Sequence, residues 1–216
     1  MIPTDVRPFP EELLLLCADP ARGRFRSPSA HLRHVVAGAV LAELLVTGAI
    51  TVEKQQITGY RPVGAPDEVA AGVLARLEAK GKSRFRPRLT QAIRSVPDRP
   101  GYRFHLDRLV AQGYYAVEEK RFLGLPYRRY PTTRPNAARE IAARVAATLS
   151  APDGGAGRPS AERDRQLAGL IDAAGLARRL YPGREGAPIR RAASRLAREL
   201  PVPRAVRTVI REKSGE

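Results

Sequence analysis

The sequence predicts a mainly α-helical fold with one or two small β-hairpins. Segments with apolar residues at helical spacing occupy most of the 216 residues. Two short segments, 49–60 and 114–131, instead alternate and contain turn residues, a pattern typical of hairpins. The most apolar stretch, residues 35–50, is too short to span a bilayer comfortably and contains Glu43, so we interpret it as a buried helix.

The elements follow one another with short connections. In chain order we expect helices over 9–19, from Ser29 to Gly48, over 65–81, two shorter ones within 82–113, one over 136–150, one from Ser160 through Ala174, and two over 188–200 and 203–213. The helix from Ser29 is apolar around nearly its whole circumference, which predicts a central position. Residues 151–160, which are rich in glycine and proline, read as a loop, and 20–28 as another.

Polar residues and glycines mark the predicted helix ends. Ser29, Asn136 and Ser160 are expected N-caps, because their side-chain oxygens can accept a hydrogen bond from a free backbone N–H. Gly48 and Gly81 are expected to end their helices, since glycine adopts the left-handed conformation without steric cost.

The charge balance points to an anionic partner. The chain has 38 Lys and Arg against 22 Asp and Glu, a formal net charge of +16 and a pI near 11.0. Such an excess attracts polyanions, either nucleic acid or an anionic membrane surface. The preference for Arg over Lys can reflect codon composition alone, but codon composition does not account for the excess of bases over acids. The single cysteine, Cys17, permits no intramolecular disulfide and fits a reducing compartment.

Signals for catalysis and metal binding are poor. His31 and His34 lie three residues apart on one helical face, but no Cys or acidic residue accompanies them nearby in sequence. Cys17 ends an apolar helix, where a buried inert thiol is expected. Glu43 is a single carboxylate rather than an acid/base pair. We therefore expect no enzyme, no metal site and no cofactor.

The stretch RFLGLPYRRYP, residues 121–131, combines apolar side chains with a turn. Phe122, Leu123 and Leu125 surround Gly124 and Pro126, which mark the turn. Basic residues lie in two flanking segments: Lys82, Arg84, Arg86, Arg88, Arg94, Arg99, Arg103 and Arg108, then Lys120, Arg121, Arg128, Arg129 and Arg134. The apolar residues can fold back into the core, pack on a neighbouring subunit, or enter a lipid interface. An apolar tip surrounded by basic residues favours the lipid interface, because peripheral proteins combine these two weak membrane signals.

Four segments resemble the Golgi phosphoprotein 3 (GPP34) family in its shorter, bacterial form. They are PEELLLLCADPARGRF, AGAVLAELLVTGAITVE, DRLVAQGYYAVEEKRFLGLPYRRYP and RQLAGLIDAAGLARRLYP. The resemblance implies a single domain over residues 1–216, with a helix bundle wrapped by amphipathic helices and flexible ends at 1–10 and 212–216. It also implies a projecting hairpin that supports oligomerisation and faces the membrane, phosphatidylinositol 4-phosphate binding, and a non-enzymatic adaptor role.

The resemblance also places the family's lipid site on this sequence. Its Trp and Arg positions fall near Pro28 and at Ala37, which do not match, and Arg33 lies one turn before Ala37. The other two basic positions fall near Arg99 and Tyr102, with Arg103 adjacent. We therefore expect an anionic phospholipid site that accepts phosphoinositides, with headgroup ligands at Arg33, Arg99, Arg103, Arg128 and Arg129, and a membrane or oligomer contact at Phe122, Leu123 and Leu125.

These expectations describe a peripheral membrane protein. We expect it in the cytoplasm on the inner face of a membrane, with a homo-oligomer through 121–131 and a membrane-protein client as partners. Two alternatives remain open. Residues 103–131 also fit a winged helix that binds DNA, and the hairpin can act as a protein-interaction element that packs into a partner subunit.

Overall fold

The computed structural model describes residues 7–20, 22–25, 29–61, 67–81, 86–96, 101–123, 125–152 and 158–214. It confirms the mainly α-helical fold. The helices are α1 (Phe9–Cys17), α2 (Ser29–Val46), α3 (Glu68–Gly81), α4 (Leu89–Ser95), α5 (Gly101–Ala111), α6 (Asn136–Ser150), α7 (Pro159–Ala173), α8 (Ala177–Leu180), α9 (Ala187–Glu199) and α10 (Pro201–Ser214). The strands are β1 (Ala18–Asp19), β2 (Arg24–Phe25), β3 (Ile50–Glu53), β4 (Gln56–Tyr60), β5 (Glu118–Phe122) and β6 (Leu125–Arg129).

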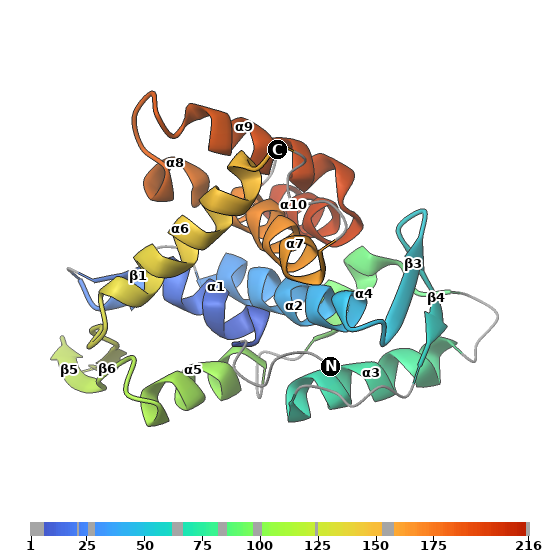
Figure 1. Ribbon diagram of the computed structural model, residues 1–216. Coiled ribbons are helices and arrows are strands. Elements are labelled where there is room, and N and C mark those ends of the chain that lie inside the picture. The colour runs from blue at the N-terminus through green and yellow to red at the C-terminus, as the bar shows by residue number, and fades with distance from the viewer. Residues whose placement is uncertain are drawn as a thin grey trace.

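Helix α2 is central, as its apolar circumference predicts. Its buried residues include Val36, Val40 and Leu41, and it packs against α1, α7 and α10 as well as α3, α4 and α5 (Figure 1). The α10 contact is close: a Cβ at Gly38 would lie only 2.1 Å from the side chain of Val206. A glycine at this position therefore allows the two helices to approach each other.

The strands form three separate antiparallel pairs, β1–β2, β3–β4 and β5–β6. The predicted hairpins at 49–60 and 114–131 are the second and third of these. In Figure 1, β5–β6 lies beside α5 at the lower left, whereas α8 and α9 form the opposite end of the molecule. The hairpin and α5 therefore form the lower left of the molecule together, and α3 continues the lower edge to the right.

Two helix starts differ from prediction. The N-cap of α6 is Pro135 and that of α7 is Arg158, so Asn136 and Ser160 lie inside the first turns. A proline lies at each of these starts: Pro135 is the N-cap of α6, and Pro159 is the first residue of α7. Neither N-cap residue makes a side-chain hydrogen bond to the backbone of its helix. Residues 9, 10 and 212–214 belong to α1 and α10, which correspond to the helices expected over 9–19 and 203–213.

The helix stops are closer to prediction. Helix α2 ends at Val46, and Gly48 follows with φ +74° in the left-handed region. Helix α3 ends at Gly81, where a Cβ would meet the ring of Tyr60 at 2.4 Å. Gly81 is therefore required by the packing of β4 on the end of α3.

Candidate functional site

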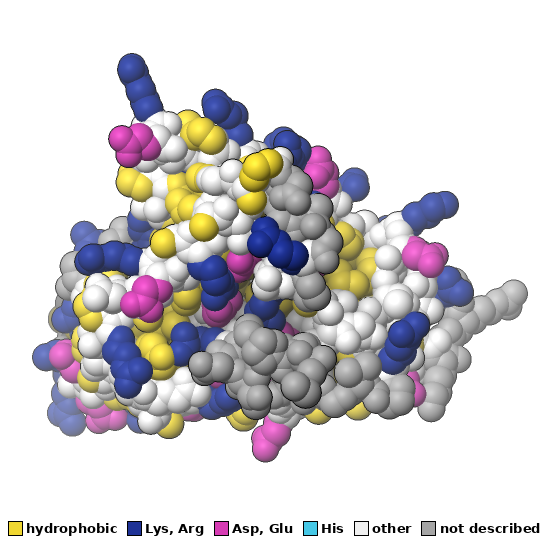
Figure 2. Space-filling view, viewed as in Figure 1, with side chains coloured by type: hydrophobic (Ala, Val, Ile, Leu, Met, Phe, Trp, Pro, Cys, Tyr) yellow, Lys and Arg dark blue, Asp and Glu magenta, His cyan; other side chains and the backbone are white. Residues whose placement is uncertain are grey.

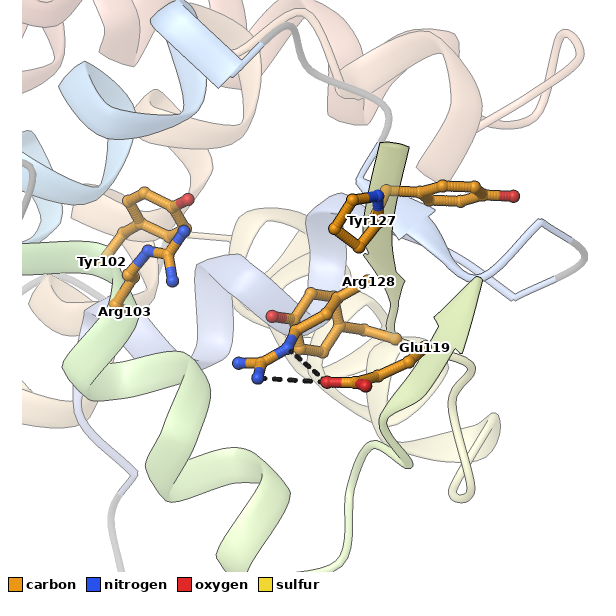
Figure 3. A pocket seen from close by; sticks show the side chains of 7 residues that line it. Tyr102, Arg103, Glu119, Tyr127 and Arg128 are labelled. Carbon is orange, nitrogen blue, oxygen red and sulfur yellow. Dashed lines mark hydrogen bonds and ion pairs between the residues drawn. The ribbon is translucent and has the colours of Figure 1, made fainter. Parts of the chain in front are cut away.

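A pocket of about 630 Å³ lies between α5 and the β5–β6 hairpin. It is lined by Tyr102, Arg103, Glu119, Pro126, Tyr127, Arg128 and Tyr130. Arg103 from the helix and Arg128 from the hairpin point into the space between these elements (Figure 3). Two arginines that lie 25 residues apart in the sequence are thus brought to one pocket.

The burial pattern of α5 positions the helical side of this pocket. His105, Leu106 and Leu109 are buried against the core. Because these residues define the inner face of the helix, Tyr102 and Arg103 in the first turn are left partly accessible beside the hairpin. A guanidinium placed in this way is suited to bidentate contacts with phosphate oxygens.

The register of the hairpin fixes the other side. Glu119 pairs with Arg128 across the two strands, and their side chains lie on one face. The Nε and Nη2 atoms of Arg128 donate to Oε1 of Glu119 at 3.3 and 3.2 Å. Both side chains are mostly exposed, so the ion pair is weak and an anionic ligand can compete for Arg128.

Arg129, another of the expected headgroup residues, contacts the backbone of the β1–β2 turn. Its Nε donates to the backbone carbonyl of Arg22 at 2.9 Å, and Nη2 contacts the same oxygen. Arg129 does not line the pocket, because its guanidinium is turned toward the Arg22 carbonyl. It fastens the hairpin to the β1–β2 turn instead.

The β1–β2 ribbon is the part of the site that the sequence reading missed. The backbone N–H of Tyr130 donates to the carbonyl of Gly23 at 2.7 Å, and the Arg24 guanidinium lies 5.4 Å from the centroid of the Tyr127 ring. Gly23 has φ +59°, and a Cβ there would lie 3.1 Å from the backbone nitrogen of Pro131. The Pro20–Gly23 turn signal predicts a reversal but not the strand that follows it.

The tip of the hairpin projects into solvent. Leu123 is 87% exposed and Leu125 is 72% exposed. Leu123 also has φ +49°, a region that costs an ordinary L residue energy and that Asn or Gly favours at a two-residue hairpin turn. Phe122 pairs with Leu125 through the strands, while its side chain lies outside the part of the chain that the structure describes. A large apolar residue is thus kept at an exposed and strained position.

Not every expected headgroup residue is found among the described residues that line the pocket. Arg33, on α2, does not line the pocket, and Arg99 and Pro28 lie outside the described residues. Ala37 is 2% exposed within the core, so no ligand reaches it. The structure therefore brings together Arg103 and Arg128 of the five expected headgroup residues.

Three titratable side chains that could be considered for catalysis or metal binding, Cys17, His34 and His105, lie in the interior. Burial raises the pKa of the Cys17 thiol to about 12, which makes it inert at neutral pH. Burial lowers the pKa of His105 to about 4, although Asp67 lies 3.8 Å away. His34 is 2% exposed, and the described residues contain no group of three or more His, Cys, Asp or Glu able to hold a metal ion.

A protein-family model described as Golgi phosphoprotein 3 (GPP34) matches residues 9–213. The chain belongs to the Golgi phosphoprotein 3 family. A search of curated proteins gave no match. The matched range includes the pocket and the β5–β6 hairpin, and it covers the described helices except for the last residue of α10. No helix among the described residues is long and apolar enough to cross a bilayer.

Proposed function

We propose that the protein is a peripheral membrane protein that binds anionic phospholipid headgroups, phosphoinositides among them, in the pocket between α5 and the β5–β6 hairpin. The observation that carries this proposal is the position of Arg103 and Arg128 in one pocket beside an exposed apolar tip. Family membership supports it at the coarser level of a phosphoinositide-binding role.

The two parts of this surface supply two different membrane signals. Each basic side chain near an anionic surface contributes on the order of 1 kcal/mol. Full burial of a leucine contributes about 1.5–3 kcal/mol, and Leu123 and Leu125 are exposed enough to gain most of this in a lipid interface. Neither signal is sufficient alone, and their sum gives reversible binding.

The pocket geometry suits a headgroup more than a deeply buried ligand. Arg103 and Arg128 approach from different elements, so a phosphate between them can be contacted from two sides. The rings of Tyr102 and Tyr130 form part of the wall and can flank an uncharged portion such as a sugar ring. The leucine tip lies on the same hairpin, so lipid tails and headgroup are met together.

We further propose that the protein acts as a non-enzymatic adaptor on the inner face of a membrane. Family membership supports a Golgi phosphoprotein-like role. Homo-oligomerisation through residues 121–131 and capture of a membrane-protein client belong to this proposal, since the exposed tip is available for either contact.

Vesicle co-sedimentation tests the lipid site. The full chain is mixed with phosphatidylcholine vesicles and with vesicles that also contain phosphatidylglycerol, phosphatidylinositol or phosphatidylinositol 4-phosphate. We expect pelleting only with the anionic vesicles, and loss of pelleting for the Arg103→Gln/Arg128→Gln variant. Equal pelleting with neutral and anionic vesicles, or an unaffected double variant, contradicts the proposal.

The winged-helix alternative is less well supported by the hairpin. Its tip carries two exposed leucines, Leu123 and Leu125. These side chains offer no hydrogen bonds to base edges in a groove. DNA binding that falls steeply with salt and is lost on deleting residues 122–127, with no vesicle binding, would favour this alternative.

A further inference from the structure

A second basic surface lies at the end of the molecule opposite the hairpin. Residues 178–199, which span most of α8 and all of α9, contain seven basic residues against two acidic ones. Lys and Arg side chains project around the end formed by α8 and α9 (Figure 2), which Figure 1 places far from β5–β6. The basic residues at this end therefore take no part in the proposed lipid site.

The outer face of α9 organises part of this charge into a groove. Ala193, Leu196 and Ala197 are buried against the core, and α9 packs on α7. The opposite face presents an open groove of about 600 Å³, lined by Pro188, Arg191, Ala192, Ser194, Arg195 and Arg198. The three arginines stand four and three residues apart, a spacing that places them on one stripe.

The groove combines a small floor with a charged rim. Pro188, Ala192 and Ser194 are short side chains, and helices that present small residues can be approached closely by another helix. The Arg191, Arg195 and Arg198 side chains are exposed. Their contacts are weak: Arg195 lies 4.0 Å from Glu199, and Arg198 donates to Ser194 Oγ at 3.1 Å and is also attracted by Asp172 of α7. The contacts with Glu199 and Ser194 lie within α9 and can be exchanged for contacts with a partner.

We propose that this groove docks an acidic amphipathic helix of a partner protein. A helix that carries Glu or Asp at i, i+4 and i+7 repeats the pitch of the Arg191, Arg195 and Arg198 stripe, so three ion pairs can form at once. A small apolar side chain of that helix then occupies the hollow over Ala192. This apolar component favours a protein partner over nucleic acid, whose backbone has no side chain to fill such a hollow.

The position of the groove supports the choice of partner. If β5–β6 meets a membrane, α9 faces away from that membrane and remains free for a second protein. The described part of α9 is about 20 Å long, which matches roughly four turns of a docked helix. The groove shares no residue with the proposed lipid pocket.

Fluorescence anisotropy with a labelled peptide tests the inference. The probe is a helical peptide of about 20 residues with Glu at i, i+4 and i+7 and Ala or Leu between, and the comparison probe has the same composition in scrambled order. We expect the full chain to bind the ordered peptide more tightly. The Arg191→Glu/Arg195→Glu/Arg198→Glu variant should lose about tenfold or more, since each exposed ion pair contributes up to about fivefold.

Two further variants make the result specific. Arg61→Glu/Arg76→Glu/Lys80→Glu makes the same charge change at exposed positions near β4 and on α3, and should bind the peptide nearly as well as the native chain. Ala192→Phe fills the floor while leaving every charge in place, and should weaken peptide binding severalfold. Equal binding of both peptides, an unaffected Ala192→Phe variant, or tighter binding of duplex DNA or anionic vesicles through the same arginines overturns the proposal. Circular dichroism checks that each variant remains folded.

Discussion

Arg163 on α7 and Glu43 on α2 form an ion pair inside the protein, with Nη1 and Oε1 2.6 Å apart and both side chains almost completely buried. Glu43 also accepts a hydrogen bond from the backbone N–H of Phe9 at 2.6 Å, and the guanidinium lies 4.0 Å from the centroid of the Phe9 ring. One carboxylate thus joins α2, α7 and the start of α1. The acid that interrupts the apolar stretch 35–50 has a structural partner 120 residues away.

Removal of Arg163 should strongly destabilise the protein. Arg163→Met keeps much of the volume but leaves Glu43 buried and unpaired, so the free energy of unfolding should fall by about 3–5 kcal/mol. Urea unfolding followed by circular dichroism measures this. The matched control is Arg195→Met, which removes an exposed pair with Glu199 and should cost at most about 1 kcal/mol. Equal small losses in both variants would show that the buried pair is not required for stability.

The sequence predicts the elements that are long enough for their apolar residues to recur at a regular spacing. Ile141 and Val145 at helical spacing indicate α6, and both are buried. Strands β1 and β2 have two residues each and α8 has four, so none shows a period. The ion pairs of Arg163 with Glu43 and of Arg144 with Glu12 join segments 120 and 132 residues apart, and nothing in a single sequence indicates such partners.

The candidate site was predictable in part for the same reason. Gly124 and Pro126 mark the turn, and the leucines at that turn are exposed. The sequence does not reveal that Glu119 faces Arg128, because that pairing depends on the register of the two strands. It also does not reveal that Arg129 is turned to the Arg22 carbonyl, because the β1–β2 ribbon was not predicted.

Stability should fall as the pH decreases from 6.5 to 4, because of His105. The pKa of His105 is lowered to about 4 by burial, so between these values the unfolded chain binds a proton that the folded chain does not. The effect amounts to roughly 3 kcal/mol. Asp67 opposes it, and Arg108 acts in the same direction as burial. Glu11, whose pKa is raised by burial, partly offsets the loss because the folded protein takes up its proton earlier.

Urea unfolding at several pH values measures this dependence. The His105→Phe variant has no titrating group at this position, so its stability should change less across the same range. The His105 ring packs edge-to-face on the Phe104 ring, with the two ring centroids 5.3 Å apart. An aromatic replacement at position 105 is therefore suitable. A native chain whose stability is constant from pH 6.5 to 4, or a variant with an unchanged slope, would contradict the role of His105.

Leu123→Asn should separate membrane binding from stability. Asn tolerates the φ of +49° better than Leu, so the hairpin should be unchanged or stabilised by up to about 1 kcal/mol. Vesicle binding should nevertheless weaken severalfold, because an exposed apolar side chain is lost from the tip. Thermal unfolding and co-sedimentation with anionic vesicles measure the two effects. A variant that is more stable and binds equally well would remove Leu123 from the membrane contact.

Glu119→Gln should increase binding to anionic vesicles. The carboxylate of Glu119 holds the Nε and Nη2 atoms of Arg128, which are the donors that a headgroup phosphate needs. Its removal frees these donors and takes one negative charge out of the pocket, so the affinity should rise about two- to fivefold. Titration of the protein with vesicles containing phosphatidylinositol 4-phosphate, at fixed salt, gives the affinity.

Glu118→Gln is the matched control for this change. It removes the same charge one residue away, but Glu118 contacts Lys120 at 3.6 Å and does not line the pocket. The general loss of repulsion from the membrane is therefore common to both variants, and only Glu119→Gln also frees Arg128. We expect the larger gain for Glu119→Gln, and expect Arg128→Gln to abolish the difference between them. Equal gains in the two variants would mean that the ion pair with Arg128 does not restrict the pocket.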